Sequence, residues 1–186
     1  MKIIINNPLE LNKLHSVQLI YPLFSLDYEF FSEPELDLHL NSETKGVYDD
    51  LLHYKRIKEL DYTSEEMKEV CEFQRQYSNL SRLESVSLYL AQREEAGIFA
   101  TNTLVRDAAI SLGITVYGYD WFFDQLSHHQ IFPPMDVFNK WKDLEKKLYA
   151  STDTTRPECV VAFYNGNSQH DQTDHSIPKT GVRRRK

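Results

Sequence analysis

The sequence predicts an α/β fold, a three-layer α/β/α sandwich whose central sheet is mainly parallel. Two observations lead to this prediction. Over residues 79–126, short apolar runs alternate with helical patterns across very short joints. A further apolar run, at residues 3–5, opens the chain. Short apolar strands that alternate with amphipathic helices are typical of a parallel sheet covered on both faces.

The elements of the first half are predicted from caps and apolar runs. Residues 3–5 should form a buried strand. Asn7 is a natural cap for a helix that starts at Pro8, and apolar positions continue that helix up to Pro22. The other elements expected before residue 63 are a strand over 28–31, a short helix over 33–40, a helix over 44–54 and a strand over 56–62.

In the second half, capping residues and glycines mark the helix ends. Thr63 opens a capping box, and Ser81 opens the next helix, which Gly97 stops. Asn102 caps a helix that ends at Gly113. The helix that Thr63 opens should turn Met67, Val70 and Cys71 inward, and strands are expected over 98–100 and 114–117. Two more helices should follow: one with the apolar residues Trp121, Phe122 and Leu126, and a last one from Pro133 with Val137, Phe138, Trp141, Leu144 and Leu148 on one face.

Length and composition suit one domain with an appendage. The chain has 186 residues, of which 41% are hydrophobic. We expect the domain to span residues 1–149. Residues 150–186 are rich in polar side chains and end in four basic residues, and we expect them to form a disordered tail.

Charge and cysteine content restrict the function classes. The net charge is −7, and residues 151–186 hold six basic and four acidic residues, so the remainder has a net charge of −9. An acidic body argues against an all-basic nucleic-acid binder, and contact with RNA would need a local basic groove. The two cysteines lack metal-ligand spacing, and no apolar run is long enough to span a membrane, so we expect a cytoplasmic protein.

Five motifs follow one another along residues 1–149: IIINNPLELNKL, YEFFSEPELDLHL, SRLESVSLYLAQ, ATNTLVRDAA and LGITVYGYDWFFDQL. In their order and spacing they resemble the PIN-domain family, the nuclease fold of VapC-type toxins in bacterial toxin–antitoxin pairs. The resemblance implies a parallel sheet with acidic side chains at the carboxyl ends of its strands. In active members, four Asp or Glu residues typically hold one or two Mg²⁺ or Mn²⁺ ions, which activate water beside a phosphodiester.

By this resemblance the metal ligands would be Asn6, His39, Glu84 and Asn102, with Glu84 as the catalytic carboxylate. One acid of four remains, so the implied site is degenerate and should hold metal weakly. The residues also have structural interpretations. Glu84 suits a capping box, Asn6 and Asn102 suit helix caps, and His39 suits the surface.

Other polar residues are weaker candidates for the same site. Asp37, Asp107 and Asp120 are possible replacement ligands. Arg106 would pair with a helix carboxylate or a carbonyl, or would bind phosphate in a site without metal.

Three functions are consistent with these patterns. The first is a PIN-like domain with lost or weakened nuclease activity that binds RNA or a protein partner, with no cofactor. The second is an active endoribonuclease of the VapC type that uses Mg²⁺ or Mn²⁺. The third is a globular protein with no nucleic-acid role. The resemblance also implies an antitoxin-like partner and a homodimer, for which the apolar face of the last helix, with Trp121 and Phe122, is the expected interface.

Overall fold

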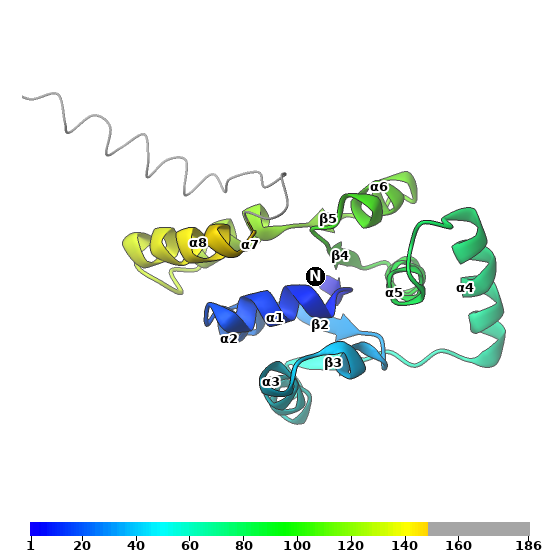
Figure 1. Cartoon of the computed structure of the whole chain (residues 1–186), viewed down its shortest axis with the longest axis horizontal. Coiled ribbons are helices and arrows are strands. Elements are labelled where there is room, and N and C mark those ends of the chain that lie inside the picture. The colour runs from blue at the N-terminus through cyan, green and yellow to red at the C-terminus, as the bar shows by residue number, and fades with distance from the viewer. Residues whose placement is uncertain (149–186) are drawn as a thin grey trace, which may run out of the picture.

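The computed structural model describes residues 1–148, which form a five-stranded sheet with helices on both faces (Figure 1). All strand pairs are parallel, and the strand order is β3-β2-β1-β4-β5. The first strand of the chain therefore lies at the centre of the sheet. The bounds are β1 Lys2–Ile5, β2 Glu29–Ser32, β3 Ile57–Glu59, β4 Gly97–Phe99 and β5 Val116–Tyr117.

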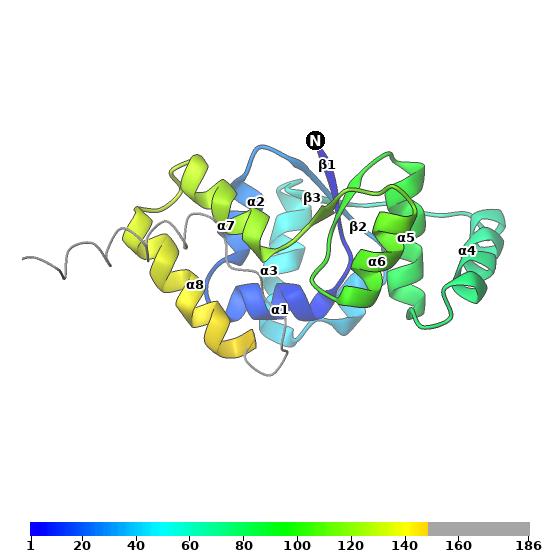
Figure 2. The ribbon, with the colours of Figure 1, turned by 90° about the horizontal axis from the view of Figure 1, so that it is seen from above.

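The helices form the two outer layers, as Figures 1 and 2 show together. One face of the sheet is covered by α1 (Pro8–Ser16), α2 (Ile20–Ser25), the 3-10 helix η1 (Leu36–His39), α3 (Ser42–His53), α7 (Tyr119–His128) and α8 (Pro134–Leu148). The other face is covered by α5 (Arg82–Arg93) and α6 (Thr103–Ser111), and α4 (Ser64–Gln76) packs on α5. The predicted three-layer α/β/α class with a parallel sheet is confirmed.

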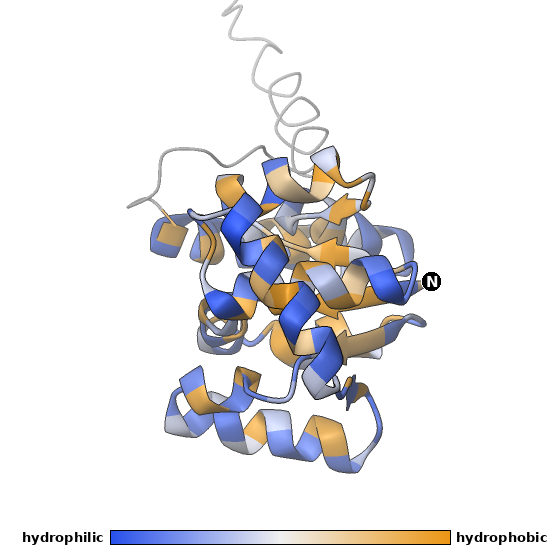
Figure 3. Cartoon of the chain, turned by 90° about the vertical axis from the view of Figure 1, so that its right-hand side faces the viewer, coloured by the Kyte–Doolittle hydropathy of each residue, from blue (hydrophilic) through white to orange (hydrophobic). Residues whose placement is uncertain are grey.

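Alternation along the strands divides the apolar residues between two cores. Ile3 and Ile5 lie in the larger core, under α1, α2, α3, α7 and α8, whereas Ile4 lies in the smaller core, under α5 and α6. All three side chains are fully buried. Side chains of a strand point alternately to its two faces, so an unbroken apolar run indicates a strand covered on both. In Figure 3 the strands are coloured mainly as hydrophobic residues, and the helices around them mix hydrophobic and hydrophilic residues.

The helix predicted from Pro8 to Pro22 is in fact two helices. α1 ends at Ser16, Gln18 has a φ of 59°, and α2 begins at Ile20. A residue in the left-handed conformation ends a helix. Pro22 then lies in the first turn of α2, where the missing N–H has no intrahelical acceptor to lose.

Two further details differ from expectation. Cys71 is exposed on α4, and Val70 is the buried residue of that helix. The apolar face of α8 is buried within this chain, since Trp141 is 1% exposed and its ring lies edge-on to Phe123 of α7 at 5.2 Å. This face belongs to the core of one chain and does not supply a dimer interface.

The predicted tail over residues 150–186 lies outside the described residues. Within residues 1–148, no helix has both the length and the apolar character needed to cross a membrane.

Candidate functional site

The carboxyl edge of the sheet, near β1 and β4, is the place where this topology favours a binding site. The chain winds outward from β1 to β3 and then crosses back to β4 on the other side of β1. In open parallel sheets, ligands bind beyond the carboxyl ends of the strands at such a reversal. The segments that leave β1, β2 and β4 here are Asn6–Asn7, Glu33–Pro34 and Ala100–Asn102.

Glu84 and Asn102, two of the four aligned residues, contact each other. The Asn102 Nδ2 donates a hydrogen bond of 2.9 Å to Glu84 Oε1. The other oxygen, Oε2, accepts from the backbone N–H and the hydroxyl of Ser81, both at 2.8 Å, in the predicted capping box of α5. The Asn102 Oδ1 accepts from Leu104 N at 3.0 Å and caps α6. Glu84 therefore completes the cap of α5 and Asn102 caps α6. The hydrogen bond between them also connects α5 to the turn after β4.

Asn6 and Glu33 occupy equivalent positions one residue beyond β1 and β2. Ile5 pairs with Ser32, so the register brings the next two residues side by side on the face that α5 covers. Asn6 is fully buried and Glu33 is 1% exposed. Among the described residues, neither amide atom of Asn6 nor Oε1 of Glu33 has a hydrogen-bond partner. Burial raises the pKa of Glu33 to about 7, although a hydrogen bond from the Glu35 N–H opposes this shift.

A third buried carboxylate, Glu10, lies in the first turn of α1 and is 3% exposed. It accepts hydrogen bonds from the Thr101 hydroxyl at 2.6 Å and from the Tyr119 hydroxyl, and it pairs with Lys13 at 3.3 Å. Burial, followed by the charge of Glu10 and this hydrogen bond, raises the pKa of Tyr119. Thr101 and Asn102 are thus held from opposite faces of the sheet, by α1 and α5.

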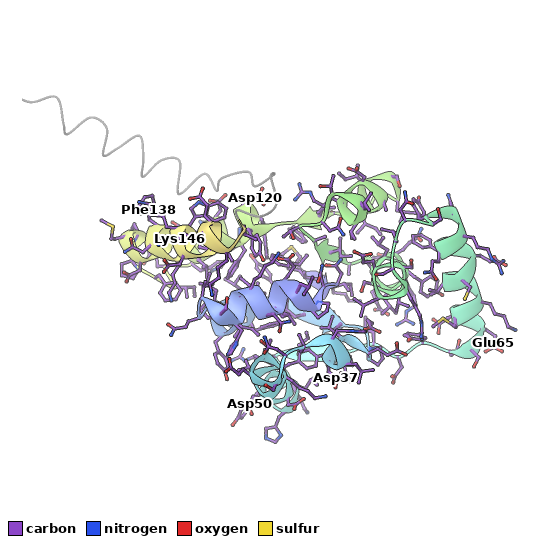
Figure 4. All side chains as sticks on the ribbon, viewed as in Figure 1. Asp37, Asp50, Glu65, Asp120, Phe138 and Lys146 are labelled. Atoms are coloured by element: carbon purple, nitrogen blue, oxygen red, sulfur yellow. The ribbon has the colours of Figure 1, made fainter. Side chains whose placement is uncertain are left out.

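Arg106 lies on α6, and its guanidinium group reaches Gly118, the residue before α7. A Cβ atom built on Gly118 would lie 3.1 Å from Arg106 Nη1 and 2.6 Å from Asp120 Oδ1, so a larger residue here would displace the ends of these two side chains. The backbone N–H of Arg106 donates to the Asn102 carbonyl oxygen at 3.0 Å, but within residues 1–148 its side chain has no hydrogen bond or ion pair. Figure 4 shows Asp120 near the junction of β5 and α7.

The other candidate ligands lie elsewhere or have partners. His39 is exposed at the end of η1, and no hydrogen bond or ion pair in the described part of the chain links it to Asn6, Glu84 or Asn102. Asp37 pairs with Lys45 at 2.7 Å. Asp107 is exposed on α6.

These residues do not fit a site for two divalent ions. Both oxygens of the one remaining aligned carboxylate, Glu84, are hydrogen-bonded within the protein, and Asn102 turns its N–H group rather than its oxygen toward it. Residues 1–148 contain no group of three or more His, Cys, Asp or Glu residues arranged to hold a metal ion. Mg²⁺ prefers several oxygen ligands with formal charge, and this edge does not offer them together.

Sequence reasoning missed Glu10 and Glu33. Glu33 was assigned to a helix start, but its place directly after a strand, like that of Asn6, was an available signal. No local signal marks the burial of Glu10, because the two hydroxyl groups that donate to it, those of Thr101 and Tyr119, are 91 and 109 residues away.

Comparison with protein-family models finds no match to this chain. Comparison with curated proteins finds no similar sequence either.

Proposed function

We propose that this chain is a PIN-like protein related to the toxin–antitoxin ribonucleases, that it lacks two-metal nuclease chemistry, and that it acts in the cytoplasm by binding RNA or a protein partner. The observation that carries this proposal is the hydrogen bond from Asn102 to Glu84. The motif resemblance supplies the family, and the parallel sheet with polar residues beyond its strand ends is consistent with it.

The physical argument concerns charge. Two carboxylates at this distance would repel each other, by about 4 kcal/mol for unit charges at 4 Å and an effective dielectric constant of 20. In a metal-dependent site the cation removes that repulsion. An amide facing a carboxylate needs no cation, because the amide N–H donates directly. The contact between Asn102 and Glu84 therefore needs no metal ion.

Polar groups at the same edge suit recognition without cleavage. Arg106 has a guanidinium group with no ion pair in residues 1–148, and a guanidinium group is well shaped for a phosphate. An antitoxin-like partner and a homodimer remain part of the proposal through the resemblance, with an interface other than the apolar face of α8.

The test combines calorimetry with a cleavage assay. Titration with Mn²⁺ should show roughly millimolar affinity or weaker, and a fluorescent RNA should stay intact. In the double variant Asn6→Asp/Asn102→Asp, affinity for Mn²⁺ should rise by orders of magnitude because charged oxygens return to the strand ends. Wild-type cleavage that is abolished both by chelator and by Glu84→Ala would contradict the proposal and identify an active endoribonuclease.

A further inference from the structure

A basic groove lies between the end of α1 and the side of α8. It has a volume of about 360 Å³ and is lined by Ser16, Val17, Gln18, Lys140, Asp143, Lys146 and Lys147. Three lysines and one aspartate give the lining a formal charge of +2, whereas the whole chain has a net charge of −7. In Figure 2, α1 begins beyond β1 at the carboxyl edge and runs sideways toward α8, so the groove lies at the far end of α1 from the residues described above.

The helix end beneath the groove holds two of the lysines in place. Lys140 Nζ donates to the Val17 carbonyl oxygen at 2.9 Å and to Gln18 Oε1 at 3.3 Å. Lys147 Nζ donates to the Ser16 carbonyl oxygen at 3.4 Å. The last carbonyls of a helix lack intrahelical partners and carry partial negative charge, which attracts ammonium groups. The break between α1 and α2 at Gln18 exposes these carbonyls to α8. The groove therefore forms where the helix is interrupted.

The lysines keep hydrogen-bonding capacity toward solvent. Lys146 pairs with Asp143 at 3.2 Å, but its side chain is 74% exposed. An ammonium group has three N–H donors, and the contacts described use at most two on any of these lysines.

We infer that this groove binds the phosphate backbone of single-stranded RNA. Lysines grouped in a groove are the electrostatic pattern that polyanions recognise. An acidic protein segment fits less well, because protein interfaces rely on apolar anchors, and the one apolar lining residue, Val17, is 6% exposed.

The proposed function names two classes of partner, RNA and protein, and this inference rests on it only in choosing RNA. It does not depend on whether the carboxyl edge holds metal.

Fluorescence anisotropy with a labelled oligouridine of about 20 nucleotides, in chelator and at low salt, tests the groove. The double variant Lys146→Glu/Lys147→Glu changes the lining charge from +2 to −2. Affinity should fall about tenfold or more, and the slope of log affinity against log salt should decrease by about 1 for each lost lysine. Lys140 is left unchanged because its hydrogen bond to the end of α1, at 2.9 Å, is shorter than that of Lys147, at 3.4 Å.

The matched control is Lys68→Glu/Arg75→Glu on α4, where both residues are exposed. It changes the net charge by the same amount. α4 and α8 lie at opposite ends of the molecule, as the labels of Glu65 and Lys146 in Figure 4 show. The control should retain affinity within about threefold of the wild type.

Equal losses in the two double variants would show a general charge effect and overturn the inference. Absence of RNA binding by the wild type would overturn it as well, while leaving the protein-binding form of the proposed function intact. RNA cleavage in added Mn²⁺ would contradict the proposed function alone.

If the glutamate variant fails to fold, lysine acetylation of the wild-type protein with and without RNA tests the inference instead. Lys146 and Lys147 should be protected by RNA, Lys68 should not, and the lack of that difference would overturn the inference.

Discussion

At the scale of single residues, Glu33 should make stability depend on pH. Its pKa is raised from 4.5 to about 7, so the folded chain holds a proton on this group in a range where the unfolded chain has lost it. The free energy of unfolding should therefore contain a contribution that is complete below pH 4.5 and is lost as the pH rises through about 7. This contribution is about 3 kcal/mol.

Urea unfolding at a series of pH values measures this contribution. Glu33→Gln should be more stable than the wild type at pH 8, because a neutral amide replaces a buried charge, and the difference should shrink toward pH 5. Glu35→Gln is the control, since Glu35 pairs with Arg82 at 3.0 Å and its side chain is 42% exposed. A wild type and Glu33→Gln with parallel pH profiles would show that Glu33 is solvated.

Asn102 gives a second prediction at this scale. Asn102→Asp should lower the free energy of unfolding at neutral pH by about 1–3 kcal/mol, because the donor to Glu84 is lost and two carboxylates then face each other. Asn41→Asp is the matched control. Asn41 caps α3 by accepting from Thr44 N at 2.8 Å, and aspartate is an equally good cap. Equal losses in the two variants, measured by urea unfolding, would show that the contact with Glu84 contributes nothing.

At the scale of helices and strands, α8 should be required to close the larger core. Trp141→Ala should destabilise the protein by about 3–5 kcal/mol, because it leaves a cavity beside Phe123. Met135→Ala on the same helix, where the side chain is 52% exposed, should change the free energy of unfolding by less than about 0.5 kcal/mol. Thermal unfolding distinguishes the two. A small effect of Trp141→Ala would mean that α8 packs loosely on the sheet.

The sequence predicted elements better than it predicted burial. The caps at Asn7, Thr63, Ser81 and Asn102 are local signals, and all four hold in the structure. The same locality explains the failures. Whether a carboxylate such as Glu10 is buried depends on residues that approach from other segments, and the inward direction of the α8 face depends on contacts with α7 and α1.

Only part of the candidate site was predicted, because the sequence marks local features such as helix starts and not contacts between distant segments. Glu84 and Asn102 meet because each lies at a helix start that the sequence marks, beside adjoining elements. His39 was assigned from motif spacing alone, and the short helix η1 leaves it exposed. The position of Glu33 after a strand can be read from the sequence, but its place beside Asn6 depends on the register of β1 and β2, which the sequence does not give.

At the scale of the whole molecule, residues 1–148 contain both cores, and α8 closes the larger one. We therefore expect a chain that ends at Ala150 to melt within a few degrees of the full-length protein. Circular dichroism during heating measures both. A much lower melting temperature would mean that residues 151–186 contribute to the folded core.

The central place of β1 also has a consequence during synthesis. β1 leaves the ribosome before both of its neighbours, since Ile3 pairs with Phe30 on one side and with Gly97 on the other. At about 5–20 residues per second, several seconds separate the two pairings. In that interval β1 presents an unpaired apolar edge, the kind of edge that recruits strands from other chains. Polysomes that translate this message should therefore hold nascent chains that need a chaperone until β4 has emerged.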